Sequence, residues 1–571
     1  MTYRAPVSDI AFTLTRLAGF DRLVGQGGFP DLDEETMQAV LEAAAQLSQE
    51  VLAPLNPVGD REGARLVDGR VVVPEGFKAA LQAYGEGGWH GLSADPAYGG
   101  QGLPHALHLA VFEMWHAANM SLAIGPTLVP AALEALSVHG SDAQKARVAP
   151  RLISGEWAAT MNLTEPHAGS DVGLLRTRAE PDGKGGFRIH GEKIFITWGD
   201  HDCARNIAHL VLARLPDAPA GVKGISLFLV MRDLVDAEGR TLGPNAVRVG
   251  GLEHKLGLHG SPTCVMLYEG AEGELIGGPG EGLANMFTMM NEARLNVGIQ
   301  GVGIAHRAWQ AALAYAQERR QGRSPWSSDA PTPIWNHPDI RRRLALTKAR
   351  IDAARAICLS AAAAGDLARV SGDAAARRRE DLLTPVAKAW STDLGVEAAS
   401  EAVQVHGGMG YIEETGVAQL YRDARIAPIY EGTNAIQAND LAGRKLVGDE
   451  GEAMRELVAD IRSDISSFSG GLEGVGRRLS AGAEALETAA AWMLEHGGST
   501  DALAGATPFL KLCGDVTGGW MLARAAKADP GRAGLARLYA AHVLSGAPGL
   551  AEAIRSGAED LSALTPEGLA N

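Results

Sequence analysis

The sequence predicts a mainly α-helical fold with a central β-domain, followed by a C-terminal four-helix bundle and a small helical extension. Length is the first reason, because 571 residues exceed what one ordinary core accommodates, so several packed units are expected. The second reason is a change in the spacing of the apolar residues along the chain. Apolar residues recur at helical spacing on both sides of residues 158–276, where short apolar runs between Gly and Pro have the pattern of strands. The third is composition, since 46% hydrophobic but only 5% aromatic residues suit closely packed helices.

Residues 1–157 are expected to form an N-terminal helical domain. Asp31, Leu32 and Asp33 have the character of a capped helix start, and apolar residues follow them at helical spacing. These apolar residues are Met37, Val40, Leu41, Ala44 and Leu47. Further helices are predicted over residues 77–84, 107–120 and 131–138.

Three histidines, His105, His108 and His116, lie in or just before the helix predicted over residues 107–120. Histidines at such spacing suggest a metal ion, but a metal site needs a full set of ligands. No acidic partner completes such a set in the sequence, so we interpret the three as ordinary residues on helix faces.

Residues 158–276 are expected to form a β-domain of sandwich or barrel type. The strand-like runs are residues 187–189, 194–196, 210–212, 225–230 and 265–267. A Gly turn at Gly191 is predicted to separate the first two runs.

Residues 277–446 are expected to form the four-helix bundle. Long helices are predicted over residues 277–323, 339–370 and 381–406, with a loop rich in Pro and Ser at 324–338. Two Gly-rich segments, 277–282 and 298–303, resemble nucleotide-binding loops. The second lies inside a helix, where Gly allows close helix contact, and neither follows a strand with a P-loop lysine. We therefore reject both as nucleotide-binding loops.

Residues 447–571 are expected to form a helical extension that docks on the main body. Whether the extension lies at a subunit contact stays open. A Gly-rich joint at 469–476 precedes helices predicted over residues 478–495, 507–526 and 535–544. Apolar residues such as Leu479 and Leu486 require a partner surface, and no residue of the extension indicates catalysis.

The charge balance argues against nucleic acid and membrane partners. The chain carries 52 basic and 68 acidic side chains, a formal net charge of −16. Such a chain repels phosphate backbones and anionic membrane surfaces, so an anionic ligand must be met by locally placed Arg, Lys or helix N-termini.

Cysteine usage and the N-terminus indicate a cytoplasmic protein. The four cysteines lie far apart and form no C-x-x-C pair, which is typical of thiols in a reducing compartment. The first residues carry no apolar signal segment, and we identify no run long enough to span a bilayer.

The stretch over residues 422–434 carries the candidate chemistry. It joins a charged helix to an apolar strip that ends in a lone carboxylate, Glu431. Because Ile429, Tyr430 and Gly432 flank this carboxylate, we expect partial desolvation, which raises the pKa toward the range where a carboxylate acts as a base. For this stretch alone, the alternative is a helix end capped by Gly-Thr after an exposed glutamate.

Four separated blocks give Glu431 its context. They are Met-Asn-Leu-Thr-Glu-Pro-His-Ala-Gly-Ser-Asp at 161–171, Gly-Glu-Lys-Ile-Phe-Ile-Thr-Trp-Gly at 191–199, Glu-His-Lys-Leu-Gly-Leu-His-Gly-Ser-Pro-Thr-Cys at 253–264, and Gln-Val-His-Gly-Gly-Met-Gly-Tyr at 404–411 with the 422–434 stretch. In order, spacing and chain context they resemble the flavin-dependent acyl-CoA dehydrogenases, over about residues 40–446. The segment after residue 446 resembles the longer bacterial branch of that family, which includes 3-(methylthio)propanoyl-CoA dehydrogenases.

The resemblance implies FAD as the cofactor. Backbone N–H groups of residues 161–170 and the Thr164 hydroxyl would follow the flavin's pyrimidine edge, and residues 195–197 would pack on its rings. Family members often carry Trp at the Phe195 position, and the alternative for this block alone is a plain β-hairpin. Arg319, His337 and residues 404–408 would reach the FAD of a neighbouring subunit. The implied FAD contacts are Met161, Leu163, Thr164, Gly169, Ser170, Phe195, Ile196, Thr197, Arg319, His337, Gln404, Val405, His406, Gly407, Gly408, Thr433 and Asn434.

The resemblance also implies the substrate path and the reaction. The implied acyl-CoA contacts are Ser170, Asn291, Arg294, Tyr430 and Gly432, and the family commonly has Asp at the Asn291 position. Glu431 would take the α-proton while a β-hydride passes to flavin N5, giving a trans-2-enoyl-CoA. The whole long branch implies a short acyl chain, with a thioether as in 3-(methylthio)propanoyl-CoA.

Several alternatives stay open at this point. The resemblance implies an electron-transfer flavoprotein as electron acceptor, but an acyl-CoA oxidase that uses O₂ shares most of these motifs. A dehydrogenase for medium or long acyl chains and a non-enzymatic subunit that binds flavin or acyl-CoA are the others, the last ranked lowest because the base is present. A homodimer or tetramer is implied, because Arg319 would otherwise face solvent.

Overall fold

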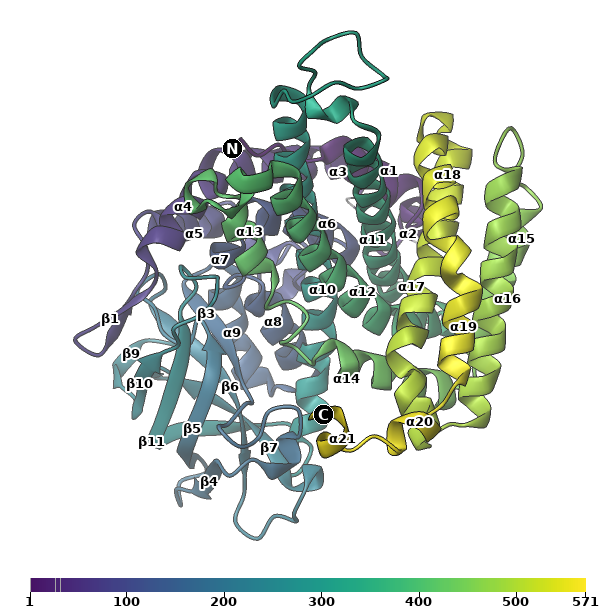
Figure 1. The fold of residues 1–571 in the computed structure, drawn as a ribbon. Helices are drawn as coiled ribbons and strands as arrows, with labels where there is room; N and C mark the ends of the chain where they lie inside the picture. The colour runs from purple at the N-terminus through teal and green to yellow at the C-terminus, as the bar shows by residue number, and fades with distance from the viewer. Residues whose placement is uncertain (1, 26, 31, 571) are drawn as a thin grey trace.

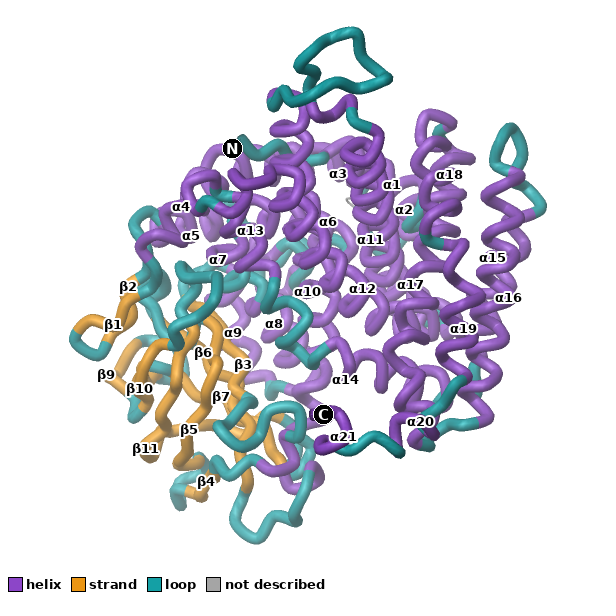
Figure 2. Tube along the Cα trace, viewed as in Figure 1, coloured by secondary structure: helices purple, strands orange, loops and turns teal. Residues whose placement is uncertain are grey.

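The computed structural model describes residues 2–25, 27–30 and 32–570. Helices occupy most of the molecule, and the strands gather in one region at the lower left of Figure 1. Figure 2 shows the same division by colour, with the helices of residues 452–555 stacked on the side away from the strands. The predicted fold class is therefore confirmed.

The N-terminal part is helical, as predicted. Its helices are α1 Val7–Arg16, α2 Phe20–Gly25, α3 Glu34–Leu47, α4 Ala53–Glu62, α5 Phe77–Glu86, α6 His105–Ala118, α7 Met120–Ala123, α8 Leu128–His139 and α9 Asp142–Ile153, with a small ribbon of β1 Arg65–Val67 and β2 Arg70–Val72. The Asp33 side chain caps α3 by accepting a hydrogen bond of 2.7 Å from the Thr36 N–H. Asp31, the other residue of the predicted cap, lies outside the described residues. Every residue of α6 is buried, so this helix forms the centre of the N-terminal part.

One apolar stretch corrects the sequence analysis, which identified no run long enough to cross a membrane. Residues Met120–His139 meet that criterion by length and composition, with a mean hydropathy of 1.4. However, 78% of the stretch is buried inside the protein, and it is divided between α7 and α8. A helix in the core of a helical protein must be apolar on all sides, so the same composition arises without a membrane.

The β-domain is a closed barrel with two additional strands. Its strands are β3 Trp157–Asn162, β4 Arg178–Pro181, β5 Phe187–Thr197, β6 Asn206–Arg214, β7 Ile225–Met231, β10 Val247–Leu252 and β11 Thr263–Ile276. Pairing runs from β11 to β5, β4, β6 and β7, and β7 pairs back to β11, so the path closes. β3 joins β6 in parallel and β10 joins β11, while β8 Asp233–Val235 and β9 Thr241–Pro244 form a separate ribbon. Closure removes free strand edges.

The predicted turn at Gly191 is wrong, because β5 runs without a break through this position. A Cβ at Gly191 would lie 2.3 Å from the Thr177 hydroxyl oxygen. Gly is therefore required here by the close approach of the chain leading into β4, a tertiary contact that the local sequence does not reveal.

The C-terminal part of the main body contains three long helices, α10 Gly282–Glu318, α11 Pro338–Ser371 and α12 Ala374–His406, followed by the short α13 Val417–Ala424 and α14 Asn434–Asn439. The Gly-rich segment 298–303 lies inside α10 and allows close helix contact, as predicted. A Cβ at Gly301 would lie 2.4 Å from the Ser391 carbonyl oxygen in α12. α12 begins well before the predicted start at residue 381, because residues 374–380 are good helix formers without an apolar period, and Asp373 caps them.

The extension docks on the main body, as predicted. Its main helices are α15 Glu452–Ile465, α16 Glu473–Glu495, α17 Thr500–Ala528, α18 Ala533–His542 and α19 Ala547–Arg555, with the short α20 Glu559–Ser562 and α21 Pro566–Ala570 at its end. The Trp390 indole of α12 donates a hydrogen bond of 3.0 Å to the buried Asp515 carboxylate of α17. Gly514 lies against the same ring, where a Cβ would stand 2.4 Å from it. The close packing of Gly514 on the Trp390 ring and the buried Trp390–Asp515 hydrogen bond thus help to hold the extension on the main body.

We expect Trp390→Phe to lower the thermal midpoint of unfolding. The substitution keeps most of the ring but removes the indole donor from the Asp515 carboxylate, which retains Lys511 at 2.5 Å, so we expect a cost of about 1 kcal/mol. Differential scanning calorimetry measures the change. Trp326→Phe is the matched control, because Trp326 is exposed and its loss should leave the midpoint unchanged. Equal midpoints for both variants would contradict this role for Trp390.

Candidate active site

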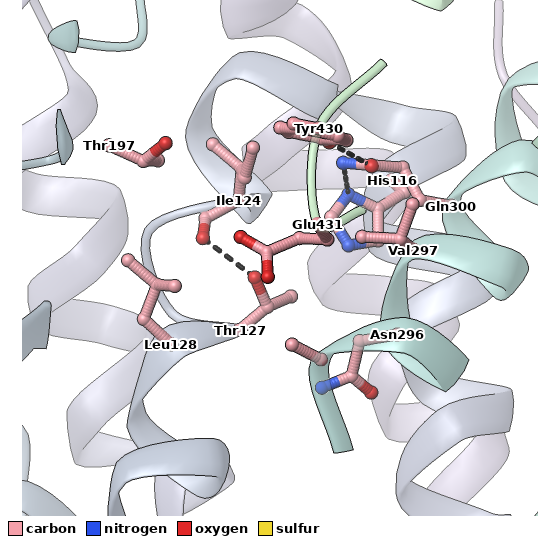
Figure 3. A pocket seen from close by; sticks show the side chains of 11 residues that line it. His116, Ile124, Thr127, Leu128, Thr197, Asn296, Val297, Gln300, Tyr430 and Glu431 are labelled. Atoms are coloured by element: carbon pink, nitrogen blue, oxygen red, sulfur yellow. Dashed lines mark hydrogen bonds between the residues drawn. The ribbon is translucent and has the colours of Figure 1, made fainter. Parts of the chain in front are cut away.

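Glu431 lies in the loop between α13 and α14, in a backbone conformation that favours glycine. Its φ is +54°, and the next residue, Gly432, has a φ of +81°. A non-glycine residue in the left-handed region costs conformational energy, and such residues cluster at functional sites. The loop thereby turns the Glu431 side chain into a pocket that residues of other segments also line (Figure 3).

The Glu431 side chain lines a small cavity between the helical parts and the barrel. In Figure 3 the carboxylate lies between Thr127 and Tyr430, with residues of α10 on a further side. The lining residues are His116, Ile124, Thr127, Leu128, Thr197, Ala293, Asn296, Val297, Gln300, Tyr430 and Glu431. The cavity measures about 30 Å³, room for about two ordered waters. Elements far apart in the sequence therefore build one site.

The Glu431 carboxyl has the electrostatic setting of a base. Burial raises its pKa from the ordinary 4.5 to about 7, while the positive charges of Lys388 and Arg294 oppose this rise. The direction is the one that the sequence predicts. Below about pH 7 the group is protonated, and above it the carboxylate can accept a proton.

Lys388 of α12 supports the loop that carries Glu431. Its ammonium is fully buried and donates to the Gly432 carbonyl at 2.8 Å and to the Asn434 side-chain oxygen at 2.9 Å. Burial lowers the pKa of Lys388 to about 7, although the Glu431 charge acts against this shift. The lysine therefore fixes the backbone directly after the carboxylate and also influences its charge.

A chain of polar side chains borders the other side of the cavity. The Tyr430 hydroxyl donates to Gln300, and the Gln300 amide donates to His116 Nδ1 at 3.3 Å. Burial lowers the pKa of His116 to about 3, so the ring is neutral. Asn296 completes this side, and neither atom of its buried amide has a partner within residues 2–25, 27–30 and 32–570.

The first two sequence blocks lie together beside the cavity. The Ile194 N–H donates to the Thr164 carbonyl at 2.9 Å, which joins residues 161–164 to β5. Thr197, at the end of β5, lines the cavity with Glu431. The Phe195 ring is 58% exposed at a φ of +60°, and it offers a flat apolar surface on the same strand end. An aromatic surface beside a hydroxyl fits the implied flavin ring system.

Several implied FAD residues have side chains that are already used inside the protein. Ile196 and Val405 are buried in hydrophobic cores, and His406 is buried against Tyr315 with a ring separation of 4.3 Å. The Asn434 side chain bonds to Lys388, Thr392, Asp393 and the Ala389 carbonyl, and Thr433 caps α14. At these positions only the backbone is free to contact a ligand. Met161, Leu163 and Thr164 are half-buried, and Gly169 and Ser170 are exposed.

A second group of implied FAD residues lies far from the cavity. Arg319 follows the last residue of α10, so at about 1.5 Å per residue it lies about 28 Å along the helix axis from Gln300. His337 bonds to the Gln321 carbonyl at 2.9 Å, and His406 stacks on Tyr315, so both flank the same end of α10. Gln404, Gly407 and Gly408 are exposed there. The structure thus divides the implied contacts into two separate groups.

The implied substrate residues also differ in position. Tyr430 lies in the cavity, Gly432 lies beside Arg294, and Asn291 and Ser170 are exposed. Arg294 is buried and forms an ion pair of 2.9 Å with Asp440, which also pairs with Arg444 at 2.6 Å, so the positive charge of Arg294 still acts on Glu431.

Sequence reasoning missed His116, Gln300, Asn296 and Lys388 as site residues. His116 was interpreted as an ordinary helix-face residue, and the others were not singled out. Polar residues in long Ala-rich helices carry no local signal, and only the packing of α6, α10 and α12 around the loop brings them together. His105 pairs with Glu292 of α10 at 2.7 Å, a contact between helices that the local sequence does not reveal.

Comparison with protein families matches almost the whole chain. Residues 34–156, 160–271 and 280–446 match the N-terminal, middle and C-terminal domain models of acyl-CoA dehydrogenases. Residues 452–565 match a model described as acetyl-CoA dehydrogenase C-terminal like.

Individual relatives agree with these matches. The chain is 44% identical to the 3-methylmercaptopropionyl-CoA dehydrogenase of Ruegeria pomeroyi, over 95% of this chain and 94% of that protein. Its fold is similar to that of Caenorhabditis elegans ACDH-11 in complex with C11-CoA, with a TM-score of 0.81, 21% identity and coverage of 95% and 92%. An acyl-CoA dehydrogenase from Bacillus anthracis, complexed with FAD, gives a TM-score of 0.74 at 22% identity over 92% and 88%.

Proposed function

This chain belongs to the acyl-CoA dehydrogenase family, and from that premise we propose that it oxidises a short acyl-CoA carrying a thioether, with Glu431 as the base. It is an FAD-dependent oxidoreductase. The observation that carries the assignment of the base is that Glu431, with a pKa raised to about 7, shares one cavity with Thr197 on the strand implied to face the flavin.

The proposed chemistry uses the chain's own groups as follows. The Glu431 carboxylate takes a proton from the carbon next to the thioester carbonyl, which breaks that C–H bond and leaves Glu431 protonated. The Glu431 backbone N–H is proposed to donate to the thioester carbonyl and so stabilise the charge that develops on it. Bound substrate excludes water from a cavity of this size, which strengthens both interactions. The bound FAD supplies the hydride acceptor, and Phe195, Thr197 and Thr164 are proposed to hold its ring system.

One observation supports a short substrate, because the Ruegeria relative is named for a short acyl chain with a thioether. An anaerobic flavin-bleaching screen against acyl-CoAs of increasing length tests the proposal. We expect 3-(methylthio)propanoyl-CoA to bleach the flavin fastest, and a maximum at medium or long chains would overturn the assignment.

We also propose an electron-transfer flavoprotein as the electron acceptor, supported by a relative that is named as a dehydrogenase. The competing oxidase would pass electrons to O₂. Steady release of hydrogen peroxide from purified enzyme and substrate, without added acceptor, would favour the oxidase.

We propose a homodimer or tetramer. The exposed residues Arg319, Gln404, Gly407 and Gly408 lie at the end of α10, about 28 Å along the helix axis from Gln300 in the cavity of their own chain. They therefore fit the FAD of a neighbouring subunit. Light scattering of the FAD-loaded protein gives the mass in solution. A monomer with full FAD occupancy would contradict the proposal.

For the organisation of the chain we propose domain limits of 1–157, 158–276, 277–446 and 447–571. The ends of β11 at Ile276 and of the π-helical segment Asp440–Val447 support the last two limits. A cytoplasmic location is proposed as well, supported by four free cysteines.

We expect kcat/KM to rise with pH through an apparent pKa near 7. Glu431 must be ionised to accept a proton, and because burial raises its pKa to about 7, activity should be lost as the pH falls through this value. The kcat/KM profile reports the groups of the free enzyme, so initial rates between about pH 5 and 9 provide the measurement. A midpoint near the ordinary glutamate value of about 4.5 would show that the base is not desolvated.

A further inference from the structure

We propose that Asn296 makes the enzyme selective for acyl chains that carry a neutral hydrogen-bond acceptor, such as a thioether or ether, over plain alkyl chains. The inference rests on the proposed function and deepens it, because it names the residue that reads the substituent.

The first observation is the state of the Asn296 side chain. It lies on α10, is only 3% exposed and lines the cavity that holds Glu431. Among the residues that the structure describes, neither its amide nitrogen nor its amide oxygen has a hydrogen-bond partner. Buried polar groups are nearly always paired, so an unpaired amide on a residue that lines a ligand cavity indicates that the ligand supplies the partners.

The second observation is an unpaired donor on the same cavity. His116 Nδ1 accepts from the Gln300 amide, so the proton of the neutral ring lies on Nε2, and this buried Nε2–H has no partner in the described part of the chain. Tyr430 holds Gln300 in the orientation that fixes this arrangement, since its hydroxyl donates to the Gln300 side-chain oxygen. Asn296 and His116 therefore both offer N–H groups to the cavity.

The remaining walls define the rest of the ligand. Ile124, Leu128 and Val297 are apolar and suit methylene and methyl groups. Neither Asn296 nor neutral His116 carries a positive charge, and the nearby cations Lys388 and Arg294 contact Gly432, Asn434 and Asp440 instead. An acyl chain ending in a carboxylate would therefore meet two neutral groups at this wall, whereas a neutral sulfur or oxygen can accept from an N–H group.

Three acyl-CoAs of equal chain length test the inference: pentanoyl-CoA, 3-methoxypropanoyl-CoA and 3-(methylthio)propanoyl-CoA. Because the heteroatom also changes intrinsic reactivity, the quantity to compare is the kcat/KM ratio of the ether to the alkyl substrate in different variants. We expect Asn296→Leu, which keeps the size but removes the amide, to lower this ratio at least about tenfold, with a smaller change in the same direction for the thioether.

The control is Val297→Ile, the next residue along α10, which alters volume but not polarity. It should change the rates on both substrates together and leave their ratio within about twofold. Asn296→Ala serves as a second variant if the leucine protein does not fold, and it should lower the ratio in the same way.

The outcomes separate the two proposals. If parent enzyme bleaches with none of the three substrates, the proposed function fails. If all proteins are active but Asn296→Leu and Asn296→Ala keep the parent's ratio, the function stands and this role of Asn296 is overturned.

Discussion

We expect Glu431→Gln to lower kcat for acyl-CoA dehydrogenation by about 10³–10⁴-fold, because the amide cannot accept the α-proton. The side chain keeps its shape and its place in the left-handed loop, so the cavity should persist. Single-turnover flavin bleaching measures the proton-abstraction step directly, and titration with product enoyl-CoA measures ligand binding. Binding should change little while bleaching nearly stops.

Glu450→Gln provides a matched control for this substitution. Glu450 has the same φ of +54°, but it lies in the turn before α15, away from the cavity. Any effect of placing Gln in a left-handed conformation should therefore occur in both variants, whereas loss of the base should occur in one. Equal rates for Glu431→Gln and the parent enzyme would remove Glu431 from the mechanism.

Glu431 was predictable as the base because the residues that indicate it are its neighbours in the sequence. Glu431 stands in a distinctive stretch, and the other blocks follow in a fixed order that resembles one family. The long helix α10 was predictable for the same reason, since apolar residues at helical spacing, such as Leu283, Phe287 and Met290, lie within one segment.

The environment of the base was not predictable, because it depends on contacts between distant segments. Lys388 lies in the interior of α12, where a single lysine usually indicates a solvated face. Asn296 and His116 reach the cavity only because α6 and α10 cross there, with the glycines of segment 298–303 allowing their close approach. Gly191 was misinterpreted for the same reason, since the contact that requires it comes from Thr177.

We expect Lys388→Met to lower kcat/KM at pH 6 by about 100-fold, through two separable effects. The first is positional, because the Gly432 carbonyl and the Asn434 side chain lose the donor that holds the loop, at 2.8 and 2.9 Å. The second is electrostatic. Lys388 opposes the rise of the Glu431 pKa, so its removal raises that pKa further. At a pH below the pKa, the ionised fraction of the base falls about tenfold when the pKa rises by about one.

The pH profile distinguishes these effects. The rising limb of kcat/KM should move to higher pH in Lys388→Met, and above it the deficit should shrink to about tenfold, the share expected for lost positioning. Lys445→Met is the control, because Lys445 pairs with Asp381 at 2.6 Å and neither residue lines the cavity. A uniform loss across the whole pH range would mean that Lys388 acts only on the loop, and an unchanged rate would contradict both effects. Since the same lysine contacts the residue after Glu431 and opposes the effect of burial on its pKa, one buried side chain contributes to both the geometry and the basicity of the catalytic group.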